Sequence, residues 1–267
     1  MIKLLDNPKI IEKLCTAEPY MGSIFMAAAT AFYDSSELMT VWTELDEHGN
    51  AISALNVGTE ELMLLCGKNL PGAEMLAFMS KLAEDDKITE ICCGDGAFPV
   101  LKAVFGENTE VLPLMKCSKH IKYSREGIPP FVKNDIKGFY TLVCSEFDGA
   151  APDYEMWVLK MARNINRGQS EIVTIEQDGK PVSGACIRGR SPGGGGIVSV
   201  VTLPEYRRQG FGSAVTAECA EILKSQGLSS WLCPCDDRAN RLYSRLGFKP
   251  CGNFNTIYLD KEENSNE

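Results

Sequence analysis

A short segment around residue 210 combines arginines and glycines in a pattern that suits phosphate binding. Arg207 and Arg208 precede Gly210 and Gly212, an apolar β-branched run covers 197–202, and a helical pattern follows the glycines. A strand, a glycine turn and a helix in this order leave the first helix amides without internal partners, where the helix dipole carries partial positive charge. Glycine also lets the backbone approach a ligand closely. The segment is therefore predicted to be a phosphate cradle.

Two common phosphate loops do not fit this segment. The pattern G-x-x-x-x-G-K-[ST] is absent from the chain, which excludes the usual nucleoside triphosphate loop. A dinucleotide fingerprint needs a third glycine three residues after Gly212, and Val215 stands there.

The remaining pattern, Arg-x-x-Gly-x-Gly from 207 to 212, resembles motif A of the GNAT acyltransferase superfamily. A second segment, 236–248, is similar to motif B of the same family, with Ala239, Leu242-Tyr243 and Gly247-Phe248 at matching positions. Asp236 stands where asparagine is frequent, and Arg245 where lysine is frequent. The resemblance covers about residues 150–260.

The resemblance implies an N-acetyltransferase that uses acetyl-CoA as co-substrate and a small amine or peptide as acceptor. The amine would attack the thioester directly, a backbone amide near Val200 or Val201 would polarise the carbonyl, and Tyr243 would protonate the departing thiolate. A phenol with a pKa of about 10 can donate to an alkyl thiolate. The general base stays open, with Glu171 and Glu176 on a candidate strand. The implied cofactor-binding residues are Val200, Val201, Thr202, Arg207, Arg208, Gln209, Gly210, Phe211, Gly212, Ser213 and Asn240.

Two alternatives remain beside this hypothesis. A non-catalytic module that senses acyl-CoA or binds a partner would keep the cradle without turnover, and Tyr243 would then be a packed aromatic side chain. A hydrolase has little support, because no G-x-S-x-G occurs and neither histidine has an evident nucleophile.

Composition narrows the class of protein. The 267 residues carry a formal charge of −9 and are 44% hydrophobic, which excludes global disorder and argues against duplex nucleic acid or anionic membrane as the main partner. No apolar stretch reaches the ~20 residues of a spanning helix, and the first residues lack an export-signal pattern. Nine of the ten arginines follow residue 137, which favours an anionic ligand in the second half.

The cysteines indicate a reducing environment. Their number is odd, eleven, and most lie in apolar runs, which is typical of reduced core thiols in a cytoplasmic protein. With two histidines and Cys233-Pro234-Cys235 as a lone pair of cysteines, no metal site is expected.

The elements that must position these residues occur in two similar runs. Each half has the pattern hairpin, strand, helix, strand, helix, strand, and 177–180 is predicted as a hairpin turn. The four glycines at 193–196 are expected to form a flexible hairpin tip. We predict an α/β (α+β) fold with a mixed, mostly antiparallel sheet flanked by helices, in two tandem GNAT-like domains. The predicted boundaries are 1–122 for the first domain, 123–137 for a linker and 138–267 for the acetyl-CoA-binding domain.

The first half lacks the chemical features of the second. Its equivalent loop, 66–73, has Lys68 but no arginine, and Pro71 stands where an amide donor is needed. Lys102 stands opposite Tyr243 when the two halves are aligned. The first half is therefore predicted to be a degenerate, acetyl-CoA-free copy.

Overall fold

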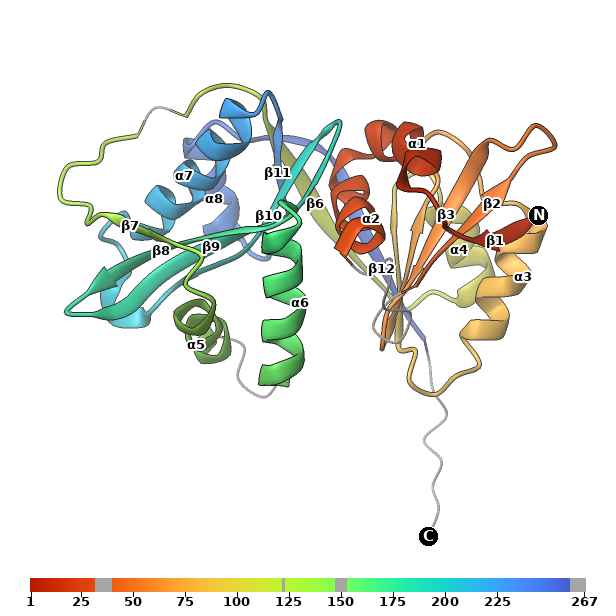
Figure 1. Cartoon of the computed structure of the whole chain (residues 1–267), viewed down its shortest axis with the longest axis horizontal. Coiled ribbons are helices and arrows are strands. Elements are labelled where there is room, and N and C mark those ends of the chain that lie inside the picture. Colours follow the sequence, from red (N-terminus) through yellow and green to blue (C-terminus); the bar gives the residue numbers. More distant parts are fainter. Residues whose placement is uncertain (32–39, 122, 147–152, 260–267) are drawn as a thin grey trace, which may run out of the picture. The chain divides into compact units, whose positions relative to one another are not determined.

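The chain divides into two compact units. A computed structural model describes residues 1–31, 40–121, 123–146 and 153–259 (Figure 1). Unit 1 contains Met1–Pro113 and the residues from Gly252 onward, and unit 2 contains Leu114–Cys251. These bounds differ from the predicted ones, because 114–122 joins the second unit and the last strand joins the first.

Unit 1 is a sheet with helices on both faces. Its elements are β1 (Ile2–Leu4), the 3-10 helix η1 (Pro8–Ile11), α1 (Glu12–Ala17), α2 (Pro19–Ala31), β2 (Thr40–Leu45), β3 (Ala51–Val57), β4 (Glu61–Leu65), α3 (Ala73–Leu82), β5 (Glu90–Gly94), α4 (Phe98–Phe105), the start of β6 (Thr109–Cys117) and most of β12 (Lys249–Tyr258). One face packs Leu64 and Ile91 against Met79 of α3 and Leu101 of α4. On the other face, the ring of Tyr20 in α2 meets that of Phe254 in β12 edge-on, with centroids 5.8 Å apart.

The sheet of unit 1 has the order β1-β2-β3-β4-β5-β12. Its pairs are antiparallel except β4 and β5, which are parallel. β12 comes from the end of the chain, and Ile257 pairs with Ile91. Alternating apolar residues predict a strand there, but they do not specify its partner.

Unit 2 has the same kind of layering. Its elements are the end of β6, β7 (Phe131–Lys133), α5 (Ile136–Glu146), α6 (Tyr154–Asn166), β8 (Glu171–Gln177), β9 (Lys180–Ser191), β10 (Gly194–Thr202), the 3-10 helix η2 (Pro204–Tyr206), α7 (Phe211–Ser225), β11 (Ser230–Leu232) and α8 (Asp237–Arg245). The strand order is β6-β11-β10-β9-β8-β7, with β10 and β11 parallel. Helices α7 and α8 cover one face, and α5 with α6 covers the other (Figure 1).

Two local features of unit 2 follow from short sequence patterns, and the first of them confirms the predicted hairpin turn. Asp178 and Gly179 both have positive φ, 52° and 73°, and join β8 to β9 through the expected two-residue turn. Asp236 caps α8, since the amide of Ala239 donates to its Oδ1 over 2.6 Å. These devices are local, so the sequence pattern suffices to find them.

Two predictions are wrong for physical reasons. Gly194–Gly196 belong to β10 and do not form a flexible tip. Glycine is needed here for close packing, because a Cβ on Gly195 would lie 2.4 Å from Leu223 Cδ2. Within the predicted linker, Val132 of β7 pairs with Thr174, and α5 begins at Ile136. The sequence analysis missed α5, whose buried Phe139 and Leu142 lie one turn apart.

The cysteines and helices are consistent with the compositional analysis. Seven cysteines are buried, namely Cys15, Cys66, Cys92, Cys93, Cys117, Cys186 and Cys219. Burial raises the pKa of the Cys186 thiol to about 12, so this thiol stays protonated. Within the described ranges, no helix combines the length and apolarity that crossing a bilayer requires.

Glu18 is an unusual acid in unit 1. It follows α1, and its Oε2 is buried without a hydrogen-bond partner among the described residues. Burial, and to a smaller extent the charge of Asp95, raise the pKa of Glu18 from 4.5 to about 7 against the opposing effect of a backbone hydrogen bond from Gly67.

The Ile257→Ala variant should destabilise unit 1 and not unit 2. Ile257 is fully buried in the core of unit 1, so its truncation should lower the opening free energy of β4 and β5 by about 2–4 kcal/mol. Native-state hydrogen exchange of β4, β5, β8 and β9 measures this. Ile197→Ala in β10 is the matched control and should lower protection in β8 and β9. Lost protection in β8 and β9 of the Ile257 variant would contradict the assignment of β12.

The Glu18→Gln variant should change how stability depends on pH. The folded-state pKa of Glu18 lies above its unfolded value, so the wild type loses stability as pH rises from 4.5 to about 7. The variant should therefore be more stable than the wild type by about 2 kcal/mol at pH 8 and equal to it at pH 4. Urea unfolding at both pH values measures the difference, with exposed Glu12→Gln on α1 as control. An equal difference at both pH values would show that Glu18 titrates normally.

Candidate functional site

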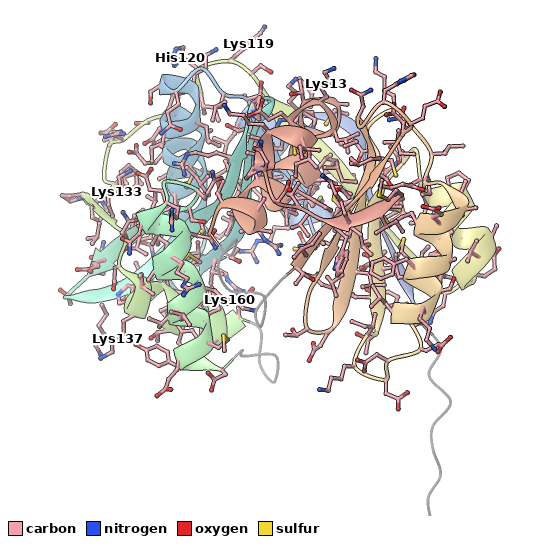
Figure 2. All side chains as sticks on the ribbon, turned by 45° about the vertical axis from the view of Figure 1, so that its right-hand side comes forward. Lys13, Lys119, His120, Lys133, Lys137 and Lys160 are labelled. Carbon is pink, nitrogen blue, oxygen red and sulfur yellow. The ribbon has the colours of Figure 1, made fainter. Side chains whose placement is uncertain are left out.

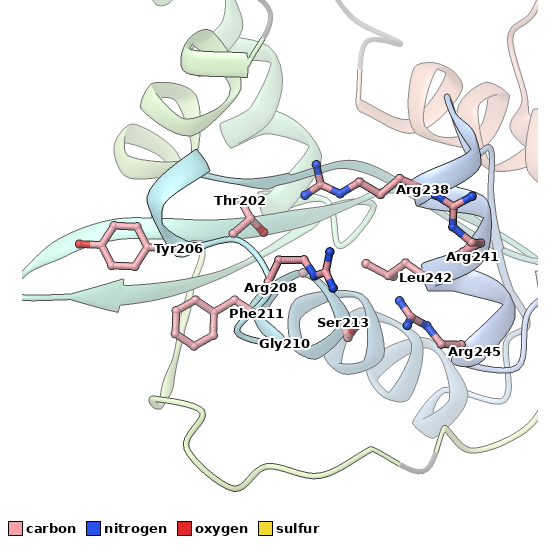
Figure 3. Close-up of a pocket in the computed structure, with 11 residues that line it drawn as sticks. Thr202, Tyr206, Arg208, Gly210, Phe211, Ser213, Arg238, Arg241, Leu242 and Arg245 are labelled. Atoms are coloured by element: carbon pink, nitrogen blue, oxygen red, sulfur yellow. The ribbon is translucent and has the colours of Figure 1, made fainter.

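Unit 2 has an open cavity of about 580 Å³ at the start of α7 (Figure 3). Its walls come from the end of β10, the loop after η2, the first turn of α7 and one face of α8. This volume lies within the usual range of small-molecule pockets.

The loop at the cavity presents a row of backbone donors. Gly210 is the N-cap of α7 with φ +88°, and Arg208 also has positive φ, +67°. In the described part of the chain, no group accepts a hydrogen bond from the six amides of 208–213, whereas the amide of Ala214 donates to Gly210 O over 3.0 Å. A Cβ on Gly212 would lie 3.3 Å from Thr202 Oγ1, a tight contact, so glycine gives the backbone the most room at this point. The amides and the helix dipole together favour an anion.

Four arginines add positive charge to the same cavity. Arg208 comes from the loop, and Arg238, Arg241 and Arg245 come from one face of α8 (Figure 3). None of the four forms an ion pair with a described acidic side chain. No aspartate or glutamate lines the cavity among the residues that the structure describes.

Arg207 has a different role from its neighbour. Its Nε donates to Thr202 O over 2.9 Å, and its guanidinium pairs with Glu146 of α5 over 2.6 Å. These contacts tie the loop to β10 and α5, and Arg207 does not line the cavity.

β10 is irregular next to the cavity. Its register with β9 shifts between Val198 and Val201, and Ser199 has a φ of +51°, which marks a bulge. β10 pairs with β11 only at Gly195 and Gly196. The following part of β10 has no described partner on its β11 side, so its edge is available for strand addition.

Tyr243 lies on the core face of α8. Its side chain is 7% exposed and its ring packs near that of Phe248. Burial raises the pKa of the Tyr243 phenol well above its usual value, and Cys235 and Asp236 raise it further. The phenol is therefore protonated at neutral pH and able to donate a proton.

The predicted residues divide into two groups. The cavity is lined by Thr202, Arg208, Gly210, Phe211, Gly212 and Ser213. The residues outside the lining are Val200, Val201, Arg207, Gln209, Asn240 and Tyr243. Val201 is buried, Gln209 Nε2 donates to Glu205 O, and Asn240 Oδ1 accepts from Ser244.

The sequence analysis missed five lining residues. They are Tyr206, Arg238, Arg241, Leu242 and Arg245. The four on α8 have helical spacing, which puts them on one face, and this spacing was the available signal.

The corresponding helix of unit 1 is capped by the protein itself. The amide of Gly72, the N-cap of α3, donates to Glu44 Oε2 over 2.9 Å. The same oxygen accepts from Ser53 Oγ over 2.8 Å, and Glu44 is 4% exposed. A carboxylate from unit 1 thus holds the position where an anionic ligand would bind.

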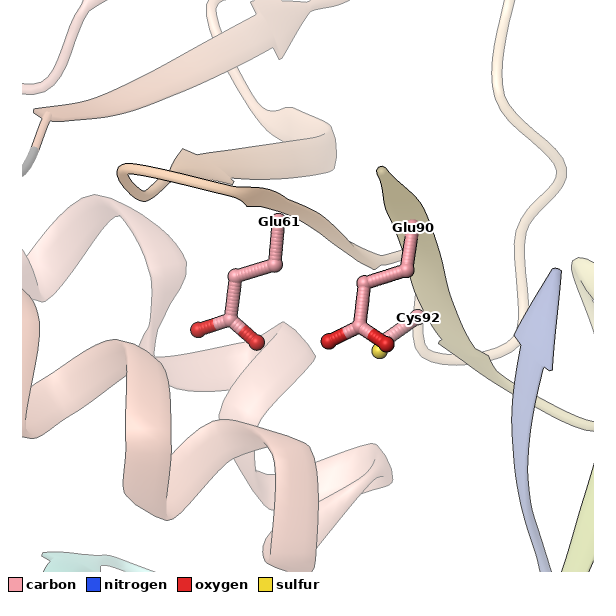
Figure 4. Close-up of side chains that lie close together, drawn as sticks. All are labelled: Glu61, Glu90 and Cys92. Atoms are coloured by element: carbon pink, nitrogen blue, oxygen red, sulfur yellow. The ribbon is translucent and has the colours of Figure 1, made fainter. Parts of the chain in front are cut away.

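Two further groups of titratable side chains lie outside the lining of the cavity. His120 Nδ1 lies 2.7 Å from Glu221 Oε2 on the outer surface of unit 2 (Figure 2). In unit 1, Glu61, Glu90 and Cys92 offer three ligand atoms within 4.8 Å of one another (Figure 4). Three such groups fall short of the four ligands of a structural zinc site.

Glu171, one of the candidate bases, is occupied by ion pairs. It pairs with Arg190 over 3.0 Å and with Lys133 over 3.9 Å. This network joins β8 to β9 and β7.

Comparison with known proteins agrees with the geometry. Residues 136–248 match the model of the Acetyltransferase (GNAT) family. No curated protein matches the chain.

Solved structures resemble the whole chain. A tandem GNAT protein from the clavulanic acid biosynthesis pathway has a TM-score of 0.64 at 13% identity, covering 98% of this chain and 99% of that chain. A GNAT-family acetyltransferase from Colwellia psychrerythraea has a TM-score of 0.58 at 12% identity, covering 97% and 100%. A GCN5-related N-acetyltransferase from Kribbella flavida has a TM-score of 0.57 at 18% identity, covering 79% and 87%.

These likenesses confirm the predicted fold class, a mixed, mostly antiparallel sheet flanked by helices in tandem units. Residues 136–248 therefore match a GNAT-family domain, and the chain as a whole shares its fold with a tandem GNAT structure.

Proposed function

We propose that the protein is an N-acetyltransferase that moves an acetyl group from acetyl-CoA to an amine. One observation carries the proposal: the six amides of 208–213 lack described acceptors and line or border an arginine-rich cavity. A diphosphate of a long thiol cofactor satisfies such a row of donors.

The irregular part of β10 supports binding of the pantetheine arm. In the proposal this arm lies along the edge of 197–202 and pairs with the strand backbone. The bulge at Ser199 redirects the following amides, and the amide of Val200 or Val201 would donate to the thioester oxygen.

Tyr243 is the proposed general acid. The acceptor nitrogen forms a bond to the acetyl carbon, the carbon–sulfur bond breaks, and Tyr243 gives its proton to the sulfur. The nitrogen loses its proton to solvent or a base, and the phenolate regains one. The raised pKa keeps the Tyr243 phenol protonated at neutral pH, as a general acid must be, but it also makes the phenol a weaker acid, so the proton moves only as negative charge develops on the sulfur.

Unit 1 is proposed to bind no acetyl-CoA. Its Glu44 carboxylate accepts from the N-cap amide of α3, and an anionic ligand there would meet a like charge. In unit 2 the matching N-cap, Gly210, has no side-chain cap. One acetyl-CoA per chain is therefore expected.

The proposed setting is the cytoplasm. Seven buried cysteines remain as free thiols, which suits a reducing compartment. The formal charge of −9 favours a cationic amine acceptor over nucleic acid.

The Gly212→Glu variant should lose acetyl-CoA binding. The new carboxylate enters the wall beside Thr202 and repels the diphosphate, so affinity should fall by at least about 100-fold. Isothermal titration calorimetry measures the affinity and should give one site per wild-type chain. Gly212→Ala is the control, because it adds only a Cβ and should stay within about fivefold. Wild-type affinity in the glutamate variant would refute the cradle.

The Tyr243→Phe variant should lose turnover and keep binding. Removing the hydroxyl deletes the general acid without opening a cavity, so kcat should fall by about 10²–10⁴-fold with an unchanged Kd for acetyl-CoA. Thiol release with a panel of amines measures kcat. Tyr258→Phe in unit 1 is the control, since its hydroxyl only donates to Glu110. Tight acetyl-CoA binding by the wild type with no thiol release for any amine would favour an acyl-CoA sensor instead.

A further inference from the structure

We propose that Arg238, Arg241 and Arg245 form a second anion subsite that binds the 3′-phosphate of coenzyme A. The protein then selects CoA thioesters over dephospho-CoA thioesters. This inference rests on the proposed function, in which acetyl-CoA is the acyl donor.

The two faces of α8 carry residues with different proposed roles, phosphate binding on one face and proton donation on the other. Residues 238, 241 and 245 share the face that lines the cavity, with Leu242 between them (Figure 3). Tyr243 lies on the opposite face, in the core of unit 2. The basic face extends over the eight residues 238–245, a rise of about 10 Å along the helix. A diphosphate, whose two phosphorus atoms share one oxygen, is shorter than this face and leaves arginines for a further anionic group.

The charge of the cavity exceeds what a diphosphate needs. The two charges of a diphosphate are balanced by the amides of 208–213, the dipole of α7 and Arg208. Three arginines on α8 remain, and no described acidic residue pairs with them. Asp236 and Asp237 begin the same helix, and Asp236 is engaged as its N-cap.

The remaining charge matches a phosphomonoester. Such a group carries about −1.5 to −2 at pH 7 and presents three acceptor oxygens. The arginine fork binds phosphate through two parallel hydrogen bonds, which suits it to this ligand better than lysine. Coenzyme A carries one phosphomonoester, at the ribose 3′ position, and dephospho-CoA lacks only that group. The two ligands therefore isolate the contribution of the α8 arginines.

The test compares Kd for CoA and dephospho-CoA by calorimetry at one fixed salt concentration. The wild type should bind CoA at least about tenfold more tightly than dephospho-CoA. In Arg241→Gln/Arg245→Gln this ratio should fall to about one to two, while Kd for dephospho-CoA changes by less than about twofold. Arg167→Gln is the control, because Arg167 is exposed outside the cavity and its loss should leave the ratio unchanged.

Each other result has a distinct meaning. Equal wild-type affinity for the two ligands overturns the subsite and leaves the proposed function intact. A double variant that keeps the wild-type ratio, or loses both ligands in parallel, also overturns it, since the arginines would then supply no local contact. A wild type that binds neither ligand refutes the proposed function itself.

Discussion

The amino end of every helix must find acceptors for its first amides, and this constraint decides where the protein can bind an anion. In several helices a side chain of the protein supplies this acceptor. Asp153 caps α6, Asp236 caps α8, and the buried Glu44 accepts from the N-cap of α3. Helix α7 begins at Gly210, which has no side chain to offer. Its amides lie at a cavity lined by arginine, and in the proposed function a bound anion is their acceptor.

The elements around the amino end of α7 leave its first amides accessible. Arg207 ties the loop to β10 and to Glu146, which holds the loop without covering its amides. β10 parts from β11 after Gly196, so its edge continues from the cavity toward the core. Helix α8 then serves both regions, with arginines on one face and Tyr243 on the other. The two tandem units share a fold but differ at the amino end of the corresponding helices α3 and α7. In unit 1 the Glu44 carboxylate accepts from the N-cap amide of α3, whereas in unit 2 Gly210 has no side chain that could cap α7.

Much of the fold and part of the site could be predicted from local patterns. The turn at Asp178-Gly179, the cap at Asp236 and the loop at Gly210 each depend on residues within a few positions of one another. Other features depend on distant neighbours. The glycines at 194–196 resemble a flexible tip in sequence, yet Leu223 and Ser229 leave no space for side chains there. Arg207 and Arg208 are neighbouring arginines, and the contacts of Arg207 with Thr202 and Glu146 give the two side chains different roles.

By itself, the sequence determined most of the strands and helices, the tandem arrangement, the glycine loop before α7 and the place of Tyr243 on a helix. These follow from residue type and short spacing, because caps, turns and side-chain periodicity act within one or two turns of the chain. Only the tertiary structure decided which strands pair and which distant side chains come into contact. It placed β12 beside β5, the end of β6 beside β11, three further arginines on the cavity wall and Glu44 on the amide of Gly72. Pairing and burial join residues far apart in the chain, and alternation along one strand carries no information about which neighbour it meets.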